Sequence, residues 1–288
     1  MDWKNQVILI TGASSGIGAA LARRLGTLGA SLVLAARSEA RLRAVADEVE
    51  RVGGKARIAI TDVTDEAQCR RAVETAIAAF GRLDILVCSA GVSMRGQFAD
   101  TSLEAIERVM RVNFFGTLYP THFALPHIRA RRGSLVAISS LVGKRGTPTY
   151  SVYGASKFAV QGLYEALRVE LAPEGVHVGI VSPGHVDTPL REQVLAPDGK
   201  PWPTPIQAPF RVWPVEMVVD KIVQLIARRW PEALLPAFVR PLLAVDDIVG
   251  TWLGDRFLRR RVAGAPLPPF EPHADEASGS SGGEPSAR

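Results

Sequence analysis

Residues 7–18 read VILITGASSGIG and decide the fold class. The first four are apolar, as in a buried strand, and a segment of helical pattern, Ala19 to Leu28, follows closely. Glycines suit a strand-to-helix turn with unusual backbone dihedral angles, in which a Cβ atom would block a bound pyrophosphate. The start of the helix adds free N–H groups and a partial positive charge. We therefore predict a phosphate-binding turn formed by Gly12, Ser14, Ser15, Gly16, Ile17 and Gly18.

Apolar runs alternate with helical segments along the rest of the chain. Strands are predicted at residues 7–10, 31–36, 56–61, 83–88, 134–139 and 176–181, and helices at 19–28, 40–52, 66–80, 154–171 and 215–229. Near-continuous apolar strands separated by helices require a parallel sheet that is covered on both faces. Right-handed crossovers then give a doubly wound sheet. The sequence predicts an α/β protein with a Rossmann-type sheet of about seven strands in a single domain.

Composition excludes several classes of protein. The chain has 288 residues, of which 47% are hydrophobic and two are cysteines, too few for a disulfide-stapled fold. It shows neither a signal peptide nor an apolar run of about 18 residues, so we expect a soluble, cytoplasmic protein. The net charge of +5 comes mostly from scattered arginines rather than a basic stripe interleaved with aromatic residues. Nucleic-acid binding is therefore not expected.

The spacing G-x-x-x-G-x-G, with Thr11 before it, resembles the short-chain dehydrogenase/reductase family. A dinucleotide site places an acidic residue at the end of the second strand for NAD, or an arginine for the 2′-phosphate of NADP. Arg37 occupies that position, and Glu39 is expected to begin the next helix. A guanidinium suits a phosphate that a carboxylate would repel. We predict that NADP(H) is preferred and that NAD(H) is possible.

Two further segments resemble the cofactor site of the family. Asp62 and Val63 follow the third strand, and the resemblance implies that Asp62 contacts the adenine ring. Ala90 and Gly91 follow the fourth strand and match a small pair that lets the cofactor approach. The two residues before this pair are Cys88 and Ser89, where the family usually has two asparagines. Cys88 is interpreted as a buried apolar residue rather than a nucleophile.

Tyr153 and Lys157 are four residues apart and therefore share one face of a helix. A phenol has a pKa of about 10, and a nearby ammonium lowers it. The fifth strand ends in Ser139 and Ser140, and Ser140 precedes Tyr153 by 13 residues, as the catalytic serine does in the family. Only one of two adjacent strand residues can face the site, and we predict that it is Ser140. Tyr150 is rejected because its i+4 residue is glycine.

The resemblance also assigns Asn113 to a proton relay through a water behind the lysine. Residues 182–188 match the family's Pro-Gly segment that holds the nicotinamide. From that segment Pro183, Gly184, Val186 and Thr188 are predicted to bind cofactor, together with Asn113, Tyr153 and Lys157. His185 is interpreted as a wall residue, and no metal site is predicted.

The resemblance to the short single-domain branch implies hydride transfer between a nicotinamide and a carbonyl or alcohol, with Tyr153 as the acid/base. The alternative is a non-catalytic NADP(H)-binding sensor or scaffold, although such relatives usually lose the Tyr or the Lys. The family also implies a homodimer or homotetramer.

Three regions are predicted. Residues 1–237 form the catalytic domain and include a proline-rich substrate lid at 189–214, which cannot be regular helix or central strand. Trp202, Phe210 and Trp213 of this lid either line an apolar pocket for a lipophilic carbonyl compound or pack the lid onto the body. Residues 238–263 form a helical extension that packs over the site or against a subunit, in preference to contacting a membrane. Residues 264–288 are rich in Pro, Gly, Ser and Glu and are predicted to be disordered.

Overall fold

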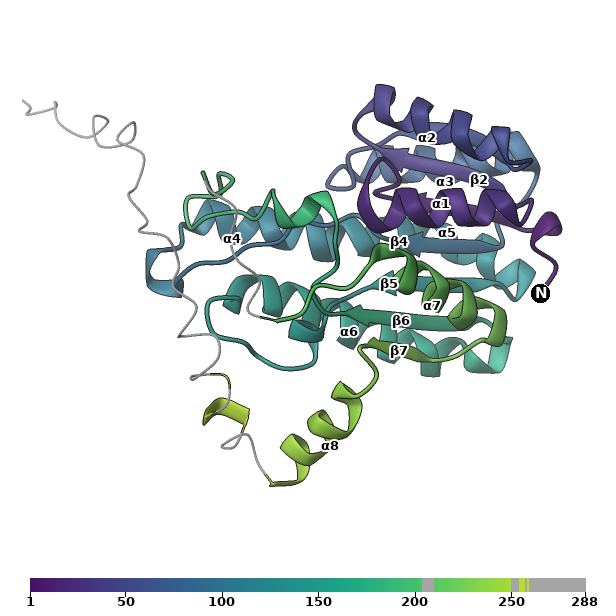
Figure 1. Cartoon of the computed structure of the whole chain (residues 1–288). Helices are drawn as coiled ribbons and strands as arrows, with labels where there is room; N and C mark the ends of the chain where they lie inside the picture. The colour runs from purple at the N-terminus through teal and green to yellow at the C-terminus, as the bar shows by residue number, and fades with distance from the viewer. Residues whose placement is uncertain (204–209, 250–253, 257, 259–288) are drawn as a thin grey trace, which may run out of the picture.

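The computed structural model describes residues 1–203, 210–249, 254–256 and 258. Seven strands form one parallel sheet in the order β3-β2-β1-β4-β5-β6-β7 (Figure 1). The strands are β1 (Val7–Thr11), β2 (Ser31–Ala36), β3 (Lys55–Ile60), β4 (Ile85–Cys88), β5 (Ser134–Ile138), β6 (His177–Pro183) and β7 (Glu232–Leu235). The order reverses between β1 and β4, and ligands of doubly wound sheets bind at the carboxyl ends of the strands beside such a reversal. The predicted fold class is confirmed.

Helices cover both faces of the sheet, which explains why the strand sequences are apolar throughout. The longer helices are α1 (Gly16–Thr27), α2 (Glu39–Arg51), α3 (Glu66–Phe80), α4 (Leu103–Met110), α5 (Gly116–Arg131), α6 (Ser151–Leu171), α7 (Val215–Arg228) and α8 (Val239–Val249). On β1, Ile8 and Ile10 pack in a core shared with α1, α2 and α7. The alternate residues Val7 and Leu9 pack in a second core shared with α3, α5 and α6. Period-two alternation therefore serves both cores.

Several elements shift by two or three residues from the sequence-based expectation, and β4 and β7 differ for a physical reason. The strand expected from residue 83 begins only at Ile85, because the Asp84 before it is a buried polar residue with its own partners. One of its carboxylate oxygens accepts the Val7 N–H at 2.9 Å, and the other pairs with Arg82 and Arg131. β7 was not assigned to any residues, because four residues beginning with a glutamate carry little periodicity. It forms because its backbone pairs in parallel with β6.

The segment between β6 and α7 forms irregular structure over the carboxyl edge of the sheet. Among its described residues, the segment 189–214 contains a single turn of 3-10 helix, Pro189–Arg191, and isolated bridges such as the one between Val186 and Trp213. The extension at 238–263 is helical at α8 and at residues 254–256 and 258. Residues 250–253, 257 and 259–263 of it and the predicted tail at 264–288 lie outside the described residues. Figure 1 shows α8 beyond β7, projecting from the edge of the sheet. Within the described chain no helix is long and apolar enough to cross a membrane.

Candidate active site

A cavity of about 1350 Å³ opens at the carboxyl ends of the strands. It brings together nearly all the residues that the sequence predicted for the site. Those in its wall are Gly12, Ser14, Ser15, Gly16, Ile17, Arg37, Asp62, Val63, Ala90, Gly91, Ser140, Tyr153, Lys157, Pro183, Gly184, Val186 and Thr188. Gly18 and Asn113 are buried behind this wall instead.

The glycine turn is shaped by close backbone approaches. Gly12 has φ +68°, and a Cβ atom there would lie 2.8 Å from the backbone of Ala90. A Cβ atom on Gly18 would lie 2.4 Å from the carbonyl oxygen of Gly12, so this glycine lets α1 pack against the turn. Thr11 accepts hydrogen bonds from the N–H groups of Ser89 and Ala90 at 3.1 and 3.3 Å. These contacts hold the turn and the Ala90 segment side by side.

At the end of β2 the cavity wall is basic. Arg37 and Arg41 both line the cavity and are exposed. The carboxylate of Glu39 pairs with Arg43 at 2.5 Å and does not line the cavity. The sequence analysis did not predict Arg41 as a site residue. Its position near the start of the expected helix, four residues after Arg37, could have indicated that it lies on the same side of the cavity. Two guanidinium groups therefore line the cavity at the end of β2, where they could bind a phosphate. The nearby carboxylate of Glu39 is already paired with Arg43.

Asp62 lies in the turn that follows β3, at the edge of the cavity. It lines the cavity, and its Oδ1 accepts hydrogen bonds from the backbone N–H and the hydroxyl of Thr64 at 2.9 and 2.8 Å. The carboxylate is therefore fixed by the turn that follows β3.

Ser140 and Tyr153 meet in the cavity. Both side chains line its wall, and the Ser140 hydroxyl donates to the carbonyl oxygen of Pro183 at 3.4 Å. Ser139 also lines the cavity, contrary to the expectation that only one of the two serines would reach it. Its hydroxyl, however, donates to the backbone carbonyl of Lys157 at 3.2 Å. The Tyr150 ring lies 6.4 Å from the Tyr153 ring and forms part of the wall.

Burial dominates the protonation of the Tyr153–Lys157 pair. Loss of solvation raises the pKa of Tyr153 to about 12, and the hydrogen bond with Ser140 opposes this rise. Loss of solvation lowers the pKa of Lys157 to about 8. The Lys157 Nζ donates to the Ile138 carbonyl at 3.0 Å and lies 5.9 Å from the centre of the Tyr153 ring. At neutral pH the site therefore holds a neutral phenol beside an ammonium. The expectation that Lys157 lowers the pKa of Tyr153 is wrong here, because burial raises that pKa and Lys157 does not offset the rise.

Asn113 lies in a π-helical segment, Arg111–Phe115, between α4 and α5. Such wide turns are rare and are frequent at functional sites. Its side chain is fully buried and clamps the backbone of Val92, accepting from the N–H at 2.8 Å and donating to the carbonyl at 3.0 Å. It also donates to the Ser156 hydroxyl at 2.9 Å. The side-chain amide and the Lys157 ammonium both border Gly91, because a Cβ atom there would lie 3.1 Å from the Asn113 Oδ1 and 3.5 Å from the Lys157 Nζ.

His185 lies in the cavity wall next to the Phe210 ring, with 6.1 Å between the ring centres. Burial is the largest cause that lowers its pKa to about 4, and the charges of Arg191 and Arg95 add to the shift. The imidazole is therefore neutral at physiological pH and cannot donate as an imidazolium. Cys88 is buried beside Tyr164, and burial raises the pKa of its thiol to about 11.

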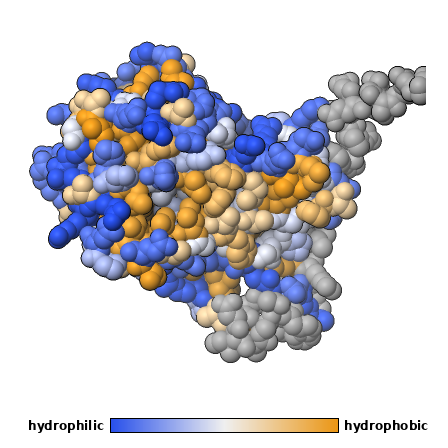
Figure 2. All heavy atoms as spheres, turned by 180° about the vertical axis from the view of Figure 1, so that it is seen from behind, coloured by the Kyte–Doolittle hydropathy of each residue, from blue (hydrophilic) through white to orange (hydrophobic). Residues whose placement is uncertain are grey.

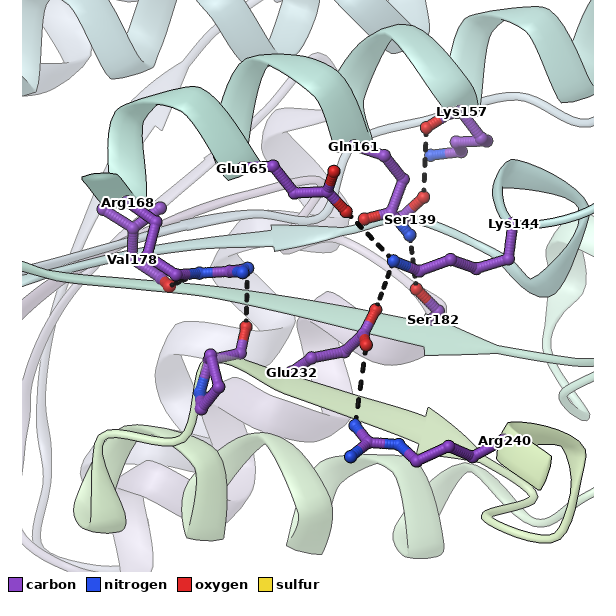
Figure 3. Close-up of polar contacts among 11 residues, drawn as sticks. Ser139, Lys144, Lys157, Gln161, Glu165, Arg168, Val178, Ser182, Glu232 and Arg240 are labelled. Carbon is purple, nitrogen blue, oxygen red and sulfur yellow. Dashed lines mark hydrogen bonds and ion pairs between the residues drawn. The ribbon is translucent and has the colours of Figure 1, made fainter. Parts of the chain in front are cut away.

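A second layer of polar contacts joins the elements around the cavity (Figure 3). Lys144, in the loop that carries Ser140, lies 3.1 Å from Glu165 of α6 and 2.6 Å from Glu232 of β7. Glu232 also pairs with Arg240 of α8 at 3.5 Å. Deeper in the structure, Gln161 of α6 donates to the Ser182 hydroxyl of β6 at 2.9 Å. This network joins the serine loop, the tyrosine helix and α8 into one framework.

The lid and α8 supply the apolar part of the wall. Phe210 and Trp213 line the cavity. Trp202 instead packs the lid onto the body: it is 6% exposed and its Nε1 donates to the Arg95 carbonyl at 3.0 Å. Phe210 and Trp213 thus line the pocket, as one interpretation expected, and Trp202 packs the lid onto the body, as the other expected. Leu242 and Val245 of α8 also line the cavity, so this helix packs over the site.

Metal-binding side chains do not cluster in the described part of the chain. No group of three or more His, Cys, Asp or Glu side chains there is arranged to hold a metal ion. Cys69 and Cys88 are both unpaired and buried.

Comparisons with known proteins agree with this geometry. A family model described as short chain dehydrogenase matches residues 6–198. An uncharacterized oxidoreductase of Bacillus subtilis is 39% identical over 224 residues, which cover 76% of this chain and 62% of that protein. The 11-beta-hydroxysteroid dehydrogenase-like 4A protein of Arabidopsis thaliana is 40% identical, over 68% of this chain and 66% of that protein. The matches thus span somewhat less than two thirds of these relatives.

Solved structures give the same result. The chain superposes on a short-chain dehydrogenase from Sphingobium yanoikuyae in complex with NADPH with a TM-score of 0.72 and 30% identity, covering 87% of this chain and 95% of that one. An alcohol dehydrogenase from the archaeon Thermococcus sibiricus, complexed with 5-hydroxy-NADP, gives a TM-score of 0.70 and 25% identity over 80% and 95% of the two chains. The chain belongs to the short-chain dehydrogenase/reductase family of oxidoreductases.

Proposed function

We propose that this protein is an NADP(H)-dependent oxidoreductase that interconverts a carbonyl and an alcohol, with Tyr153 as the acid/base. The observation that carries the proposal is the convergence of Tyr153, Ser140 and Lys157 on the same cavity as the glycine turn. A sensor or scaffold without chemistry would have no need of this set. The apolar lid supports a lipophilic substrate, and the relatives named as hydroxysteroid dehydrogenases support the same class.

The residues present fit a nicotinamide dinucleotide. The glycine turn leaves room for a pyrophosphate, and no side chain caps the start of α1 at Ser15, so its N–H groups can bind the phosphates. Pro183, Gly184, Val186 and Thr188 would hold the nicotinamide end, where a bound cofactor supplies or accepts the hydride. Asp62 and Val63 would flank the adenine.

In the reductive direction Tyr153 would donate its proton to the developing alkoxide. Its high pKa keeps the phenol protonated at neutral pH, as a proton donor requires. Ser140 would donate a hydrogen bond to the same oxygen and stabilise the charge as it forms. Lys157 would bind the ribose hydroxyls through its ammonium. Asn113 would position the Val92 backbone and Ser156 behind the lysine, and connect the relay to solvent.

Preference for NADP(H) rests on Arg37 and Arg41. Both guanidinium groups line the cavity at the end of β2, and the nearby Glu39 is already paired with Arg43. A 2′-phosphate would find two cations there, whereas a ribose diol would find no carboxylate partner.

A screen of aldehydes and ketones, followed by absorbance of NADPH and of NADH, tests the proposal. We expect NADPH oxidation with apolar carbonyl compounds and slower oxidation with NADH. Tight NADPH binding without turnover of any carbonyl or alcohol would instead favour the sensor.

We also propose a homo-oligomer formed through the face that carries α5 and α6. Figure 2 shows a broad spread of hydrophobic residues over the side of the molecule opposite Figure 1. Phe115, Phe158 and Val169 are exposed by 37%, 43% and 75%. Light scattering of the purified protein should give a dimer or a tetramer, and a monomer would refute this interface. The buried, unpaired cysteines support the cytoplasmic location expected from the sequence.

A further inference from the structure

The part of the cavity beyond the cofactor residues is largely apolar but not uniformly so. Its apolar wall comes from the lid and from α8, through Phe210, Trp213, Leu242, Leu243 and Val245. Leu242 and Val245 are 62% and 53% exposed although they line the cavity, so their surface remains available for a ligand. This wall fits a flexible or flat hydrocarbon body.

Four arginines line the same region: Arg95, Arg145, Arg191 and Arg211. Arg95 donates to the Thr149 hydroxyl at 3.1 Å, and its guanidinium lies 5.5 Å from the centre of the Tyr150 ring. Arg145 pairs with Asp255 at 2.7 Å. Arg211 stacks over Trp213 at 4.5 Å. Each of these three guanidinium groups therefore has a stable partner within the wall.

Arg191 is held less tightly than Arg95 and Arg145. Its ion pair with Asp187 is long, at 3.5 Å, and the Asp187 side chain is 77% exposed. The Arg191 side chain is itself 34% exposed and lines the cavity, so its guanidinium can be reached by a ligand. An acidic group in the cavity would form a shorter, charge-assisted contact than Asp187 does.

Arg191 lines the same cavity as His185, Tyr150 and Tyr153. The Tyr150 ring lies 6.4 Å from the Tyr153 ring, and the charge of Arg191 acts on the pKa of both His185 and Tyr150. The acidic residues in the wall do not compensate it. Asp62 is held by Thr64, and Glu104 and Glu107 lie on α4, next to Arg108 and Arg111 in the sequence.

We propose that the substrate is an amphipathic anion: a carbonyl or alcohol compound with an apolar body and a carboxylate or similar acidic group that binds Arg191. This inference rests on the proposed function, because it names the substrate class of that site. Arg191 then determines specificity, accepting the acidic group while α8 and the lid hold the apolar body. A neutral compound of the same size would not form this charge-assisted contact with Arg191.

Calorimetric titration of the full chain, loaded with NADPH, tests this with octanoate and 1-octanol, which differ in charge at one end of the same hydrocarbon and neither of which NADPH can reduce. We expect octanoate to bind about tenfold more tightly than 1-octanol, the difference that a charge-assisted hydrogen bond provides. Arg191→Gln should lose most of this preference. Arg191→Lys should retain part of it, and Arg211→Gln, which removes an equal charge from the same lid, should retain nearly all of it.

Three results would overturn the proposal: equal preferences in wild type and Arg191→Gln, an equal loss in Arg211→Gln, or a tenfold loss of NADPH affinity in Arg191→Gln. The last would assign Arg191 to the cofactor. Because binding is measured without turnover, failure to reduce any carbonyl compound would refute the proposed function separately.

Discussion

Replacing Arg37 or Arg41 with glutamine should change the cofactor preference of the enzyme. A hydrogen bond to a charged group contributes about 1.5–3 kcal/mol, and pairs in contact with water contribute less. Both side chains are exposed, so we expect each substitution to cost about 1–2 kcal/mol of NADPH binding, or about 5–30-fold in Kd. NADH lacks the 2′-phosphate, so its affinity should change little. The double variant should lose most of the discrimination between the two cofactors.

The fluorescence of reduced nicotinamide on binding measures both dissociation constants directly. Arg51→Gln, the same change at the other end of α2 and outside the cavity wall, serves as the matched control. Raising the salt concentration should weaken NADPH binding to wild type more than to the double variant, because exposed charges are screened. An unchanged NADPH-to-NADH ratio in the double variant would refute the assignment of these arginines.

Two other perturbations follow from the same site. Burial lowers the pKa of Lys157 to about 8, so its ammonium is present below this pH and lost above it. NADPH affinity should therefore fall as the pH rises through about 8. Lys157→Met should abolish this pH-dependent fall in affinity. A step that persists in the variant would assign it to another group. Gly12→Ala would place a Cβ atom 2.8 Å from Ala90 at a residue with φ +68°, so it should lower the melting temperature and abolish cofactor binding. Unimpaired binding by the variant, measured by the same fluorescence, would contradict the proposed role of the turn.

Much of the fold was predictable because the strands are buried on both faces. Continuous apolar runs such as Val7 to Ile10 and Ser31 to Ala36 identify central strands without any knowledge of their partners. β7 was not predictable in this way, since its four residues become a strand through pairing with β6. The start of β4 at Ile85 likewise depends on Asp84, whose burial is stabilised by distant partners at Val7 and Arg131.

The site was predictable where motifs carry the chemistry. Local spacing placed Tyr153 and Lys157 on one helix. Strand alternation was a weaker guide, because Ser139 and Ser140 both follow the end of β5 and both line the cavity. The substrate side was less accessible to sequence reasoning, because the lid and α8 reach the cavity through tertiary packing. Nothing in the local sequence distinguishes Trp202, which anchors the lid, from Trp213, which lines the cavity. The same holds for Arg191 among the many arginines of the chain.

The rate of NADPH oxidation by Tyr153→Phe tests the central claim most directly, with the carbonyl compound that the wild-type enzyme reduces fastest in the screen. Removal of one hydroxyl leaves the ring in place, so folding and NADPH binding can be checked on the same sample by melting temperature and fluorescence. Positioned acid–base catalysis contributes about 10²–10⁴-fold, and we expect a loss of turnover in that range. Turnover within a few-fold of wild type, in a folded variant that binds NADPH, would show that Tyr153 is not the proton donor.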